Sequence, residues 1–246
     1  MKRIAIEFSY DGTNFFGYQS QTNVRTVQGE LEKALERIFK TQIRTYAAGR
    51  TDTGVHANGQ VASFDCPIDR LTETDIRNAI NANLPDDIYI RNVWITSEDF
   101  NPRYDAKKRI YHYFVNKSKS KDMFLRKYSW WFPYELDADR MRKGATFFVG
   151  EHDFVSFSKK GDDDAKTIRT INGLRIIEMR KDLILIRVEG LSFLRGMVRS
   201  IVANLVRVGT GLWDPLTLEE VLESKDRSRS AGLAPAHGLF LYRVLF

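Results

Sequence analysis

The feature that most restricts the fold is the way two apolar spacings follow one another along the chain. Ile4, Ile6 and Phe8 recur with the period of two that is typical of a strand with one buried face. Residues 26–39 instead carry apolar side chains three and four positions apart, which predicts an amphipathic helix. The second half of the chain repeats this succession of strand and helix patterns. The sequence therefore predicts an α+β protein.

The expected elements fall into two successive halves. In the first half we expect strands over residues 4–10, 43–47, 61–64 and 88–95, and helices over 26–39 and from Thr72. In the second half we expect strands over 109–115, 168–179, 183–188 and 239–245, a loop over 159–166, and helices over 137–149, over 193–208 and from Thr217. Thr72 and Thr217 each have an acidic residue three positions later, which is capping-box spacing. We place the domain boundary between residues 104 and 105, so that 1–104 and 105–246 each form one sheet with its helices.

Composition excludes several classes of protein. Hydrophobic residues make up 43% of the chain and charged residues 28%, a balance that argues against long disorder. No apolar run approaches the roughly 20 residues that span a bilayer, so we expect no membrane segment. Glu7 comes too early for a secretory signal, and Cys66 is the single cysteine, so no intrachain disulfide is possible. We therefore expect a cytoplasmic protein.

Positive charge is concentrated in one window. The whole chain has a net charge of +6, but residues 103–127 hold nine basic and two acidic residues, so this window alone carries +7. Tyr111, Tyr113 and Phe124 are among the aromatic residues interleaved with it. Basic side chains neutralise phosphates and aromatic faces stack on bases, which favours nucleic-acid binding. A solvated lysine-rich loop beside an ordinary strand would have the same composition.

The segment Gly49–Gly59 has the most unusual chemistry in the chain. It places Asp52 between two threonines and brackets it with glycines, which let the backbone turn tightly and approach a ligand. Loops that follow a strand often hold functional side chains on a rigid scaffold. The alternative is a turn aspartate that only accepts hydrogen bonds from nearby backbone N–H groups.

The triplet Asp52-Thr53-Gly54 also occurs in aspartic proteases, where two such carboxylates share a proton. This chain has one copy, so the second carboxylate would have to come from a partner subunit. Arg50 lies two residues away, and a guanidinium there would favour ionising both carboxyls rather than keeping one protonated. The basic and aromatic window has no role in peptide cleavage. These points argue against a protease.

The catalytic signature of the tRNA pseudouridine synthase A family is similar to Gly49-Arg50-Thr51-Asp52-x-Gly54-Val55-His56-Ala57. Four further stretches resemble that family in order and spacing, namely residues 10–19, 109–113, 193–199 and 234–239. The resemblance spans nearly the whole chain. Thr53, Gly196 and Ser200 depart from residues that are common in the family, and none of these departures removes a catalytic group. They leave open a paralogue with altered target positions.

The resemblance implies a pseudouridine synthase fold, with two mixed sheet-and-helix halves around a central cleft. It implies an enzyme that isomerises uridine to pseudouridine on the 3′ side of the anticodon stem and loop of tRNA. The implied partners are tRNA and a second copy of the chain, because members of the family work as homodimers. The reaction has no net redox change and needs no cofactor, and the chain has neither a phosphate-binding loop nor a dinucleotide fingerprint. Its four histidines and one cysteine lack metal-ligand spacing.

The resemblance also implies roles for single residues. Asp52 would be the nucleophile, Arg199 would pair with it, and Tyr111 would stack on the target uracil. Arg50 would enter the space left by the extruded base or hold the displaced backbone. Without the resemblance, Tyr111 is equally well explained as a core tyrosine and Arg199 as an arginine at the end of an apolar stripe.

Phosphate contacts form the last group of expected site residues, and they position RNA without reading its sequence. The candidates, drawn mostly from the basic window, are Lys107, Lys108, Arg109, Lys117 and Lys119. Two alternatives remain at this point. One is an RNA-binding module that has kept the fold and lost the chemistry, and the other is a sibling synthase that acts on another RNA. Intact Asp52, Tyr111 and Arg199 argue against the first alternative.

Overall fold

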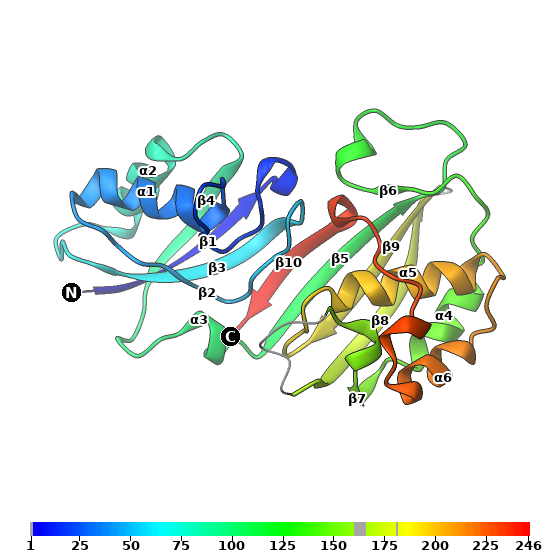
Figure 1. Cartoon of the computed structure of the whole chain (residues 1–246). Helices are drawn as coiled ribbons and strands as arrows, with labels where there is room; N and C mark the ends of the chain where they lie inside the picture. Colours follow the sequence, from blue (N-terminus) through cyan, green and yellow to red (C-terminus); the bar gives the residue numbers. More distant parts are fainter. Residues whose placement is uncertain (1, 160–165, 181) are drawn as a thin grey trace. The chain divides into compact units, whose positions relative to one another are not determined.

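The computed structural model describes residues 2–159, 166–180 and 182–246, and the chain divides into two compact units (Figure 1). Unit 1 comprises Met1–Lys107 and Leu241–Phe246, and unit 2 comprises Lys108–Phe240. The boundary drawn from the sequence, after residue 104, would leave the C-terminal residues in the second half, whereas they belong to unit 1. Most of the loop expected over residues 159–166 lies outside the described residues.

The sheet of unit 1 is built from antiparallel neighbours around its first strand. The strands are β1 (Lys2–Tyr10), β2 (Tyr46–Ala47), β3 (His56–Cys66) and β4 (Ile88–Ile95). β1 lies between β4 and β3, and β2 pairs with the far edge of β3. β10 (Leu239–Leu245) follows β3 in the strand order, and its residues from Leu241 onward belong to unit 1. A β-bulge between Phe8 and Tyr10 shifts the β1–β3 register close to the loop that precedes β3.

Within the described residues unit 1 has three helices, and the two longer ones lie together on one side of its strands (Figure 1). The three helices are α1 (Val27–Phe39), α2 (Glu73–Asn83) and the short α3 (Pro102–Asp105), with a 3₁₀ turn η1 at Gly12–Asn14. α1 buries Leu31 and Leu35 completely, as its apolar spacing predicts. Thr72 caps α2 in a full capping box, because its hydroxyl accepts the Asp75 N–H at 3.1 Å and Asp75 accepts the Thr72 N–H at 3.0 Å.

Within unit 2 the neighbouring strands are antiparallel and run in the order β5-β9-β8-β7. The strands are β5 (Lys108–Asn116), β7 (Gly150–Asp153), β8 (Ile168–Arg180) and β9 (Leu183–Gly190), and β6 (Trp130–Trp131) pairs in parallel with β5. β8 and β9 form the hairpin that the sequence predicts. Every second residue of β5 from Tyr111 to Val115 is buried on one face.

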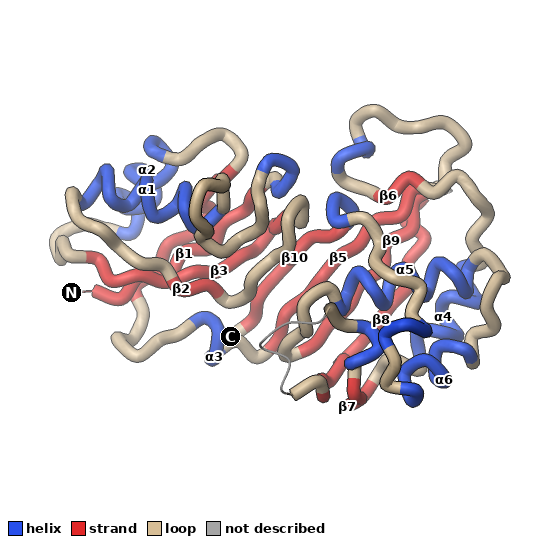
Figure 2. Tube along the Cα trace, viewed as in Figure 1, coloured by secondary structure: helices blue, strands red, loops and turns tan. Residues whose placement is uncertain are grey.

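The helices of unit 2, drawn in blue in Figure 2, are α4 (Ala138–Thr146), α5 (Met197–Gly209) and α6 (Thr217–Ser224). Four 3₁₀ turns complete the unit: η2 (Leu125–Lys127), η3 (Val155–Phe157), η4 (Arg227–Arg229) and η5 (Ala236–Gly238). α5 is buried on nearly all sides, with Ile201 and Leu205 fully inaccessible. Within the described ranges, no helix is both long and apolar enough to cross a membrane.

Several element boundaries differ from the sequence-based expectation, and three of the differences have a clear bearing on the site or the caps. β3 begins at His56 rather than near residue 61, so the loop with Asp52 is shorter than expected. α5 begins at Met197 rather than Phe193, because Gly196 has a φ of +74°, which a helix cannot continue through. Thr217 is the first residue of α6 and not its cap, since Leu216 holds the cap position without a side-chain hydrogen bond.

The capping box of α2 allows a prediction about the stability of the protein. We expect Thr72→Ala to lower the free energy of unfolding by about 1 kcal/mol, because the Asp75 N–H loses its acceptor. Thr72→Ser keeps the hydroxyl and is the matched control, so it should stay close to wild type. Chemical denaturation of all three proteins measures this difference. Equal losses in the two variants would contradict a capping role for the hydroxyl.

Candidate active site

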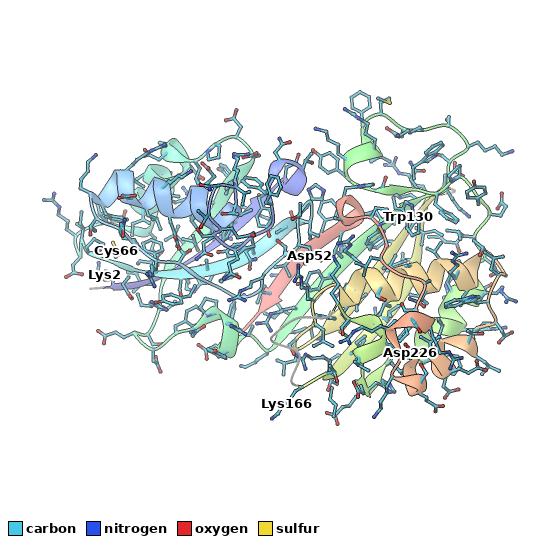
Figure 3. The ribbon with its side chains drawn as sticks, viewed as in Figure 1. Lys2, Asp52, Cys66, Trp130, Lys166 and Asp226 are labelled. Carbon is cyan, nitrogen blue, oxygen red and sulfur yellow. The ribbon has the colours of Figure 1, made fainter. Side chains whose placement is uncertain are left out.

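Asp52 lies in the short loop between β2 and β3 and is labelled in Figure 3. The loop closes on itself, because the Val55 N–H donates to the Asp52 carbonyl at 3.1 Å. Gly54 turns the chain with a φ of +75°, a conformation that few other residues adopt. The Asp52 side chain is partly exposed, whereas its neighbours Thr51 and Val55 are buried. The loop thus has a buried frame and presents one accessible carboxylate.

The segment that follows β1 holds this loop from one side. The Tyr18 N–H donates to the Thr51 carbonyl at 3.1 Å, and the Gly54 N–H donates to the Phe15 carbonyl at 3.3 Å. The hydroxyls of Tyr10 and Thr51 form a buried hydrogen bond of 2.7 Å. These bonds fall on both sides of Asp52 in the sequence, so they restrict the backbone of Asp52 from both ends.

Two glycines allow this close approach. A Cβ atom at Gly12 would lie 2.0 Å from the Val55 carbonyl oxygen, and one at Gly17 would lie 2.9 Å from that of Thr51. Gly17 also has a φ of +88°. No side chain fits between the two backbone segments at these positions. The family-like stretch over residues 10–19 therefore has a structural explanation, namely that it supports the Asp52 loop.

His56 is part of the same support. Its ring is buried, and its Nδ1 accepts the Gly12 N–H at 2.9 Å. The Asp11 carboxylate lies 3.2 Å from the same nitrogen. We therefore assign His56 a structural role, which agrees with its lack of metal-ligand spacing.

Arg25 braces the other end of the supporting segment. Its guanidinium makes two hydrogen bonds to the Asp87 carboxylate, at 2.7 and 2.8 Å, and lies 4.2 Å from the centre of the Phe15 ring. Its carbonyl accepts the Phe16 N–H at 2.9 Å. Sequence reasoning misses Arg25, because a single arginine before a helix carries no distinctive signal.

In unit 2, Tyr111 lies in β5 opposite Val188 and is 8% exposed. Its ring meets Phe193 edge to face, with the ring centres 5.1 Å apart. This contact packs the Tyr111 ring against Phe193, which precedes α5 in the chain. The geometry suits a ring that serves as a fixed surface.

Arg199 is the third residue of α5 and binds the C-terminal stretch of unit 2. Its Nε donates to the Ala234 carbonyl at 2.7 Å, and the Ala234 N–H donates back to the Arg199 carbonyl at 3.1 Å. A reciprocal pair of this kind sets both the backbone and the side chain of the arginine. The guanidinium is partly exposed and is therefore both oriented and accessible.

Tyr113 completes the support of Arg199. Its hydroxyl donates to the Pro235 carbonyl at 2.8 Å, and its ring packs so closely on Gly238 that a Cβ there would lie 2.6 Å away. Burial raises the pKa of the Tyr113 hydroxyl above its ordinary value, and the nearby Arg199 cation acts against this rise. The family-like stretch over residues 234–239 is thus anchored by Tyr113 and Arg199 together.

The candidate phosphate ligands differ in accessibility. Lys107 and Lys119 are exposed, and Lys117 is partly exposed. Lys108 pairs with Glu189 at 3.1 Å. Arg109 is only 6% exposed and donates to the Leu191 carbonyl, so its surroundings favour a structural role over a phosphate contact.

The predicted catalytic residues come from both units. Arg50 and Asp52 belong to unit 1, while Tyr111 and Arg199 belong to unit 2. Among the residues that the structure describes, no cluster of three or more His, Cys, Asp or Glu side chains could hold a metal ion.

Comparison with known proteins decides the family. A family model described as tRNA pseudouridine synthase matches residues 6–105 and 145–246. The chain belongs to this family. Both matched stretches of this tRNA pseudouridine synthase family member contain predicted site residues, with Asp52 in the first and Arg199 in the second.

Curated relatives match the chain from end to end. The proteins named tRNA pseudouridine synthase A from Fervidobacterium nodosum, Thermosipho africanus and Thermotoga maritima are 75%, 65% and 61% identical to it, and each match covers all of both chains. The crystal structure of the archaeal box H/ACA sRNP Nop10-Cbf5 complex aligns with 82% of this chain and 44% of its own chain, at 12% identity. Its TM-score of 0.36 is too low to support structural inference.

The close approach of Gly12 to Val55 allows a second prediction about stability. We expect Gly12→Ala to lower the free energy of unfolding by about 3 kcal/mol, because the new Cβ meets rigid backbone. This value is at the upper end of the usual cost of adding a methyl group to a tightly packed site. Gly173→Ala is the matched control, since a Cβ there meets nothing within 4 Å. Denaturation measures both variants. A Gly12→Ala protein as stable as the control would show that the two segments separate easily.

Proposed function

We propose that this protein is a tRNA pseudouridine synthase. The enzyme breaks the bond between uracil N1 and ribose C1′ and forms a bond from C5 to the same carbon, and the proton that C5 loses is balanced by the proton that N1 gains. The proposal rests mainly on one observation. The chain matches relatives of this name over its full length. In addition, the Asp52 loop is held by contacts on both of its sides. The atoms of the nucleoside are conserved in the reaction, so no redox partner or group donor is required.

Asp52 is the proposed reacting group. An ionised carboxylate has three ways to start the reaction, which are attack on C1′, attack on C6 of the base, and removal of the C2′ proton to give a glycal. All three require the charged form of the side chain. The partial exposure of Asp52 in unit 1 keeps this charge solvated until RNA covers it.

Three further residues are proposed to complete the site. Arg199 stabilises the Asp52 charge when bound RNA removes water, and its hydrogen bond to Ala234 directs it. Tyr111 stacks on the target uracil, with Phe193 behind it. A uridine inside a stem has to be extruded at a cost of a few kcal/mol, and Arg50, which is exposed beside Asp52, fills or supports the space that it leaves.

The finer features of the substrate and the assembly belong to the same proposal. The target is uridine on the 3′ side of the anticodon stem and loop, the enzyme is a homodimer, and it works in the cytoplasm. Lys107, Lys117 and Lys119 are the proposed phosphate contacts because they are accessible. Arg109 is proposed as a structural residue instead, because it is buried.

Substitution of the nucleophile tests the chemistry. We expect Asp52→Asn to reduce pseudouridine formation in unmodified tRNA by roughly 10⁴-fold or more, because an amide cannot replace the reacting carboxylate. Binding of tRNA should persist, since it depends mainly on phosphate contacts. The measurement maps pseudouridine at nucleotide resolution without added cofactor and determines Kd in parallel.

Asp86→Asn is the matched control, because Asp86 is an exposed aspartate in the same unit. It should leave both activity and binding unchanged. Substantial turnover by Asp52→Asn would exclude Asp52 as the nucleophile. Absence of pseudouridine with the wild-type protein would reject the proposed function, and modification outside the anticodon arm would reject the proposed target.

Substitution of lysines in the basic window tests where on the protein the RNA binds. We expect replacement of Lys117 and Lys119, together with the exposed Lys121 of the same basic window, by glutamine to weaken tRNA binding and to flatten the slope of log Kd against log salt concentration. Each lost phosphate contact should reduce the slope by about 0.7 to 0.9. The measurement is a salt titration of Kd for the triple variant and the wild type.

A second triple variant has the same change in charge and serves as the control. It replaces Lys33, Lys143 and Lys166, which are exposed and lie outside the basic window. Equal salt slopes for the two triple variants would mean that net charge alone matters, and the RNA would then have to be placed elsewhere.

A further inference from the structure

The 117–134 segment is a long connection between β5 and α4 that stands out from the sheet of unit 2 (Figure 1). It carries η2 and β6, and its side chains include lysines, arginines and aromatic rings. It lies between the two stretches that the family model matches. The family match therefore assigns it no role.

Hydrogen bonds hold both ends of the segment. At one end the Lys117 N–H donates to the Asp182 carbonyl at 2.8 Å, and at the other the Trp131 Nε1 donates to the Ser118 carbonyl at 2.9 Å. β6 also pairs with the end of β5, through Trp130 opposite Val115. The base of the segment is thus a defined structure and not a loose loop.

The tip is also held in one conformation. The Asp122 carboxylate accepts the N–H groups of Phe124 and Leu125 at 2.8 and 3.1 Å. The Ser129 hydroxyl donates to the Leu125 carbonyl at 2.9 Å. These bonds restrict the backbone of the turn that contains Phe124.

Phe124 is 88% exposed, the highest value among the large apolar side chains within the described ranges. Its neighbour Met123 is 58% exposed. A rigid turn that presents an aromatic ring to water gains nothing for the stability of the fold, because the ring buries almost no area. Contiguous exposed apolar side chains with a polar surround are typical of binding surfaces.

The charge around Phe124 indicates the kind of partner. Between residues 117 and 128 there are five basic side chains and one acidic side chain, Asp122, which gives a local charge of +4. The basic residues are Lys117, Lys119, Lys121, Arg126 and Lys127. An aromatic ring surrounded by cations complements a nucleic acid, because the ring can stack on a base while the cations bind the phosphates on either side of it.

His237, in η5, is influenced by charges from both the segment and α5. Burial lowers the pKa of His237, and the cations of Lys121 and Arg199 both lie close enough to lower it further. Lys121 also lies 5.6 Å from the centre of the Trp131 ring.

We propose that Phe124 stacks on an unpaired base of the tRNA, at a distance from the target uridine, while the neighbouring cations hold the adjoining phosphates. This inference rests on the proposed function and adds to it a second contact for an unstacked nucleotide. Stacking is tolerant of sequence, because every base has a flat face. The segment then strengthens binding without selecting a sequence.

Substitution of the ring tests the proposal. We expect Phe124→Ala to raise the Kd for unmodified tRNA by about 5- to 150-fold, the range of base–aromatic stacking. Phe124→Trp should bind at least as tightly as wild type, and Phe124→Leu should resemble Phe124→Ala. The slope of log Kd against log salt should stay that of the wild type, because no phosphate contact is lost.

Tyr89→Ala is the matched control, since Tyr89 is an exposed ring in unit 1, and it should bind as wild type does. Pseudouridine formation by the wild-type protein on the same tRNA separates the two hypotheses. An unchanged Kd for Phe124→Ala with an active wild type overturns this inference alone, whereas an inactive wild type rejects the proposed function. Wild-type affinity in Phe124→Leu also overturns it, because the ring would then make a general apolar contact and not a stacking contact. A change in the molecular mass of Phe124→Ala, measured by light scattering, overturns it as well, because the ring would then contact another protein chain.

Discussion

The close approach between the segment after β1 and the loop that precedes β3 is the constraint on which the proposed chemistry depends. Tyr10, Gly12 and Gly17 contact backbone or side-chain atoms of Thr51 and Val55, on either side of Asp52 in the sequence. A reacting carboxylate has to be held to within about 0.5 Å of its productive position. The glycines make this possible, because a Cβ at either position would force the two backbones apart.

Unit 2 solves a similar problem with different groups. Arg199 has to be directed although its side chain has many rotamers, and a reciprocal hydrogen-bond pair with Ala234 directs it. Tyr113 then holds the chain next to Ala234 through Pro235. In each unit, a buried hydroxyl and a glycine with no room for a side chain support one accessible charged group. Substitutions at these supports are expected to act on geometry, while those at Asp52 or Arg199 act on chemistry.

Elements with strong local signals could be predicted well. The capping box at Thr72, the apolar stripe of α1 and the hairpin of β8 and β9 occur where the sequence places them. The start of α5 could not be predicted, because the apolar pattern continues through Phe193 and only the left-handed backbone of Gly196 ends it. The sheet to which β10 belongs could not be predicted either, since strand pairing between distant residues leaves no periodic trace in the chain.

The sequence by itself determined the α+β class, through its two apolar periods, and it determined the family, through the motif around Asp52 and its companions. Only the tertiary structure decided what the surrounding residues do. Arg109 counts as one more cation in the basic window, and only the fold shows that it is buried and donates to the Leu191 carbonyl. Gly12, Tyr113 and Arg25 gain their roles from partners far away in the sequence, and contacts of that kind exist only once the chain has folded.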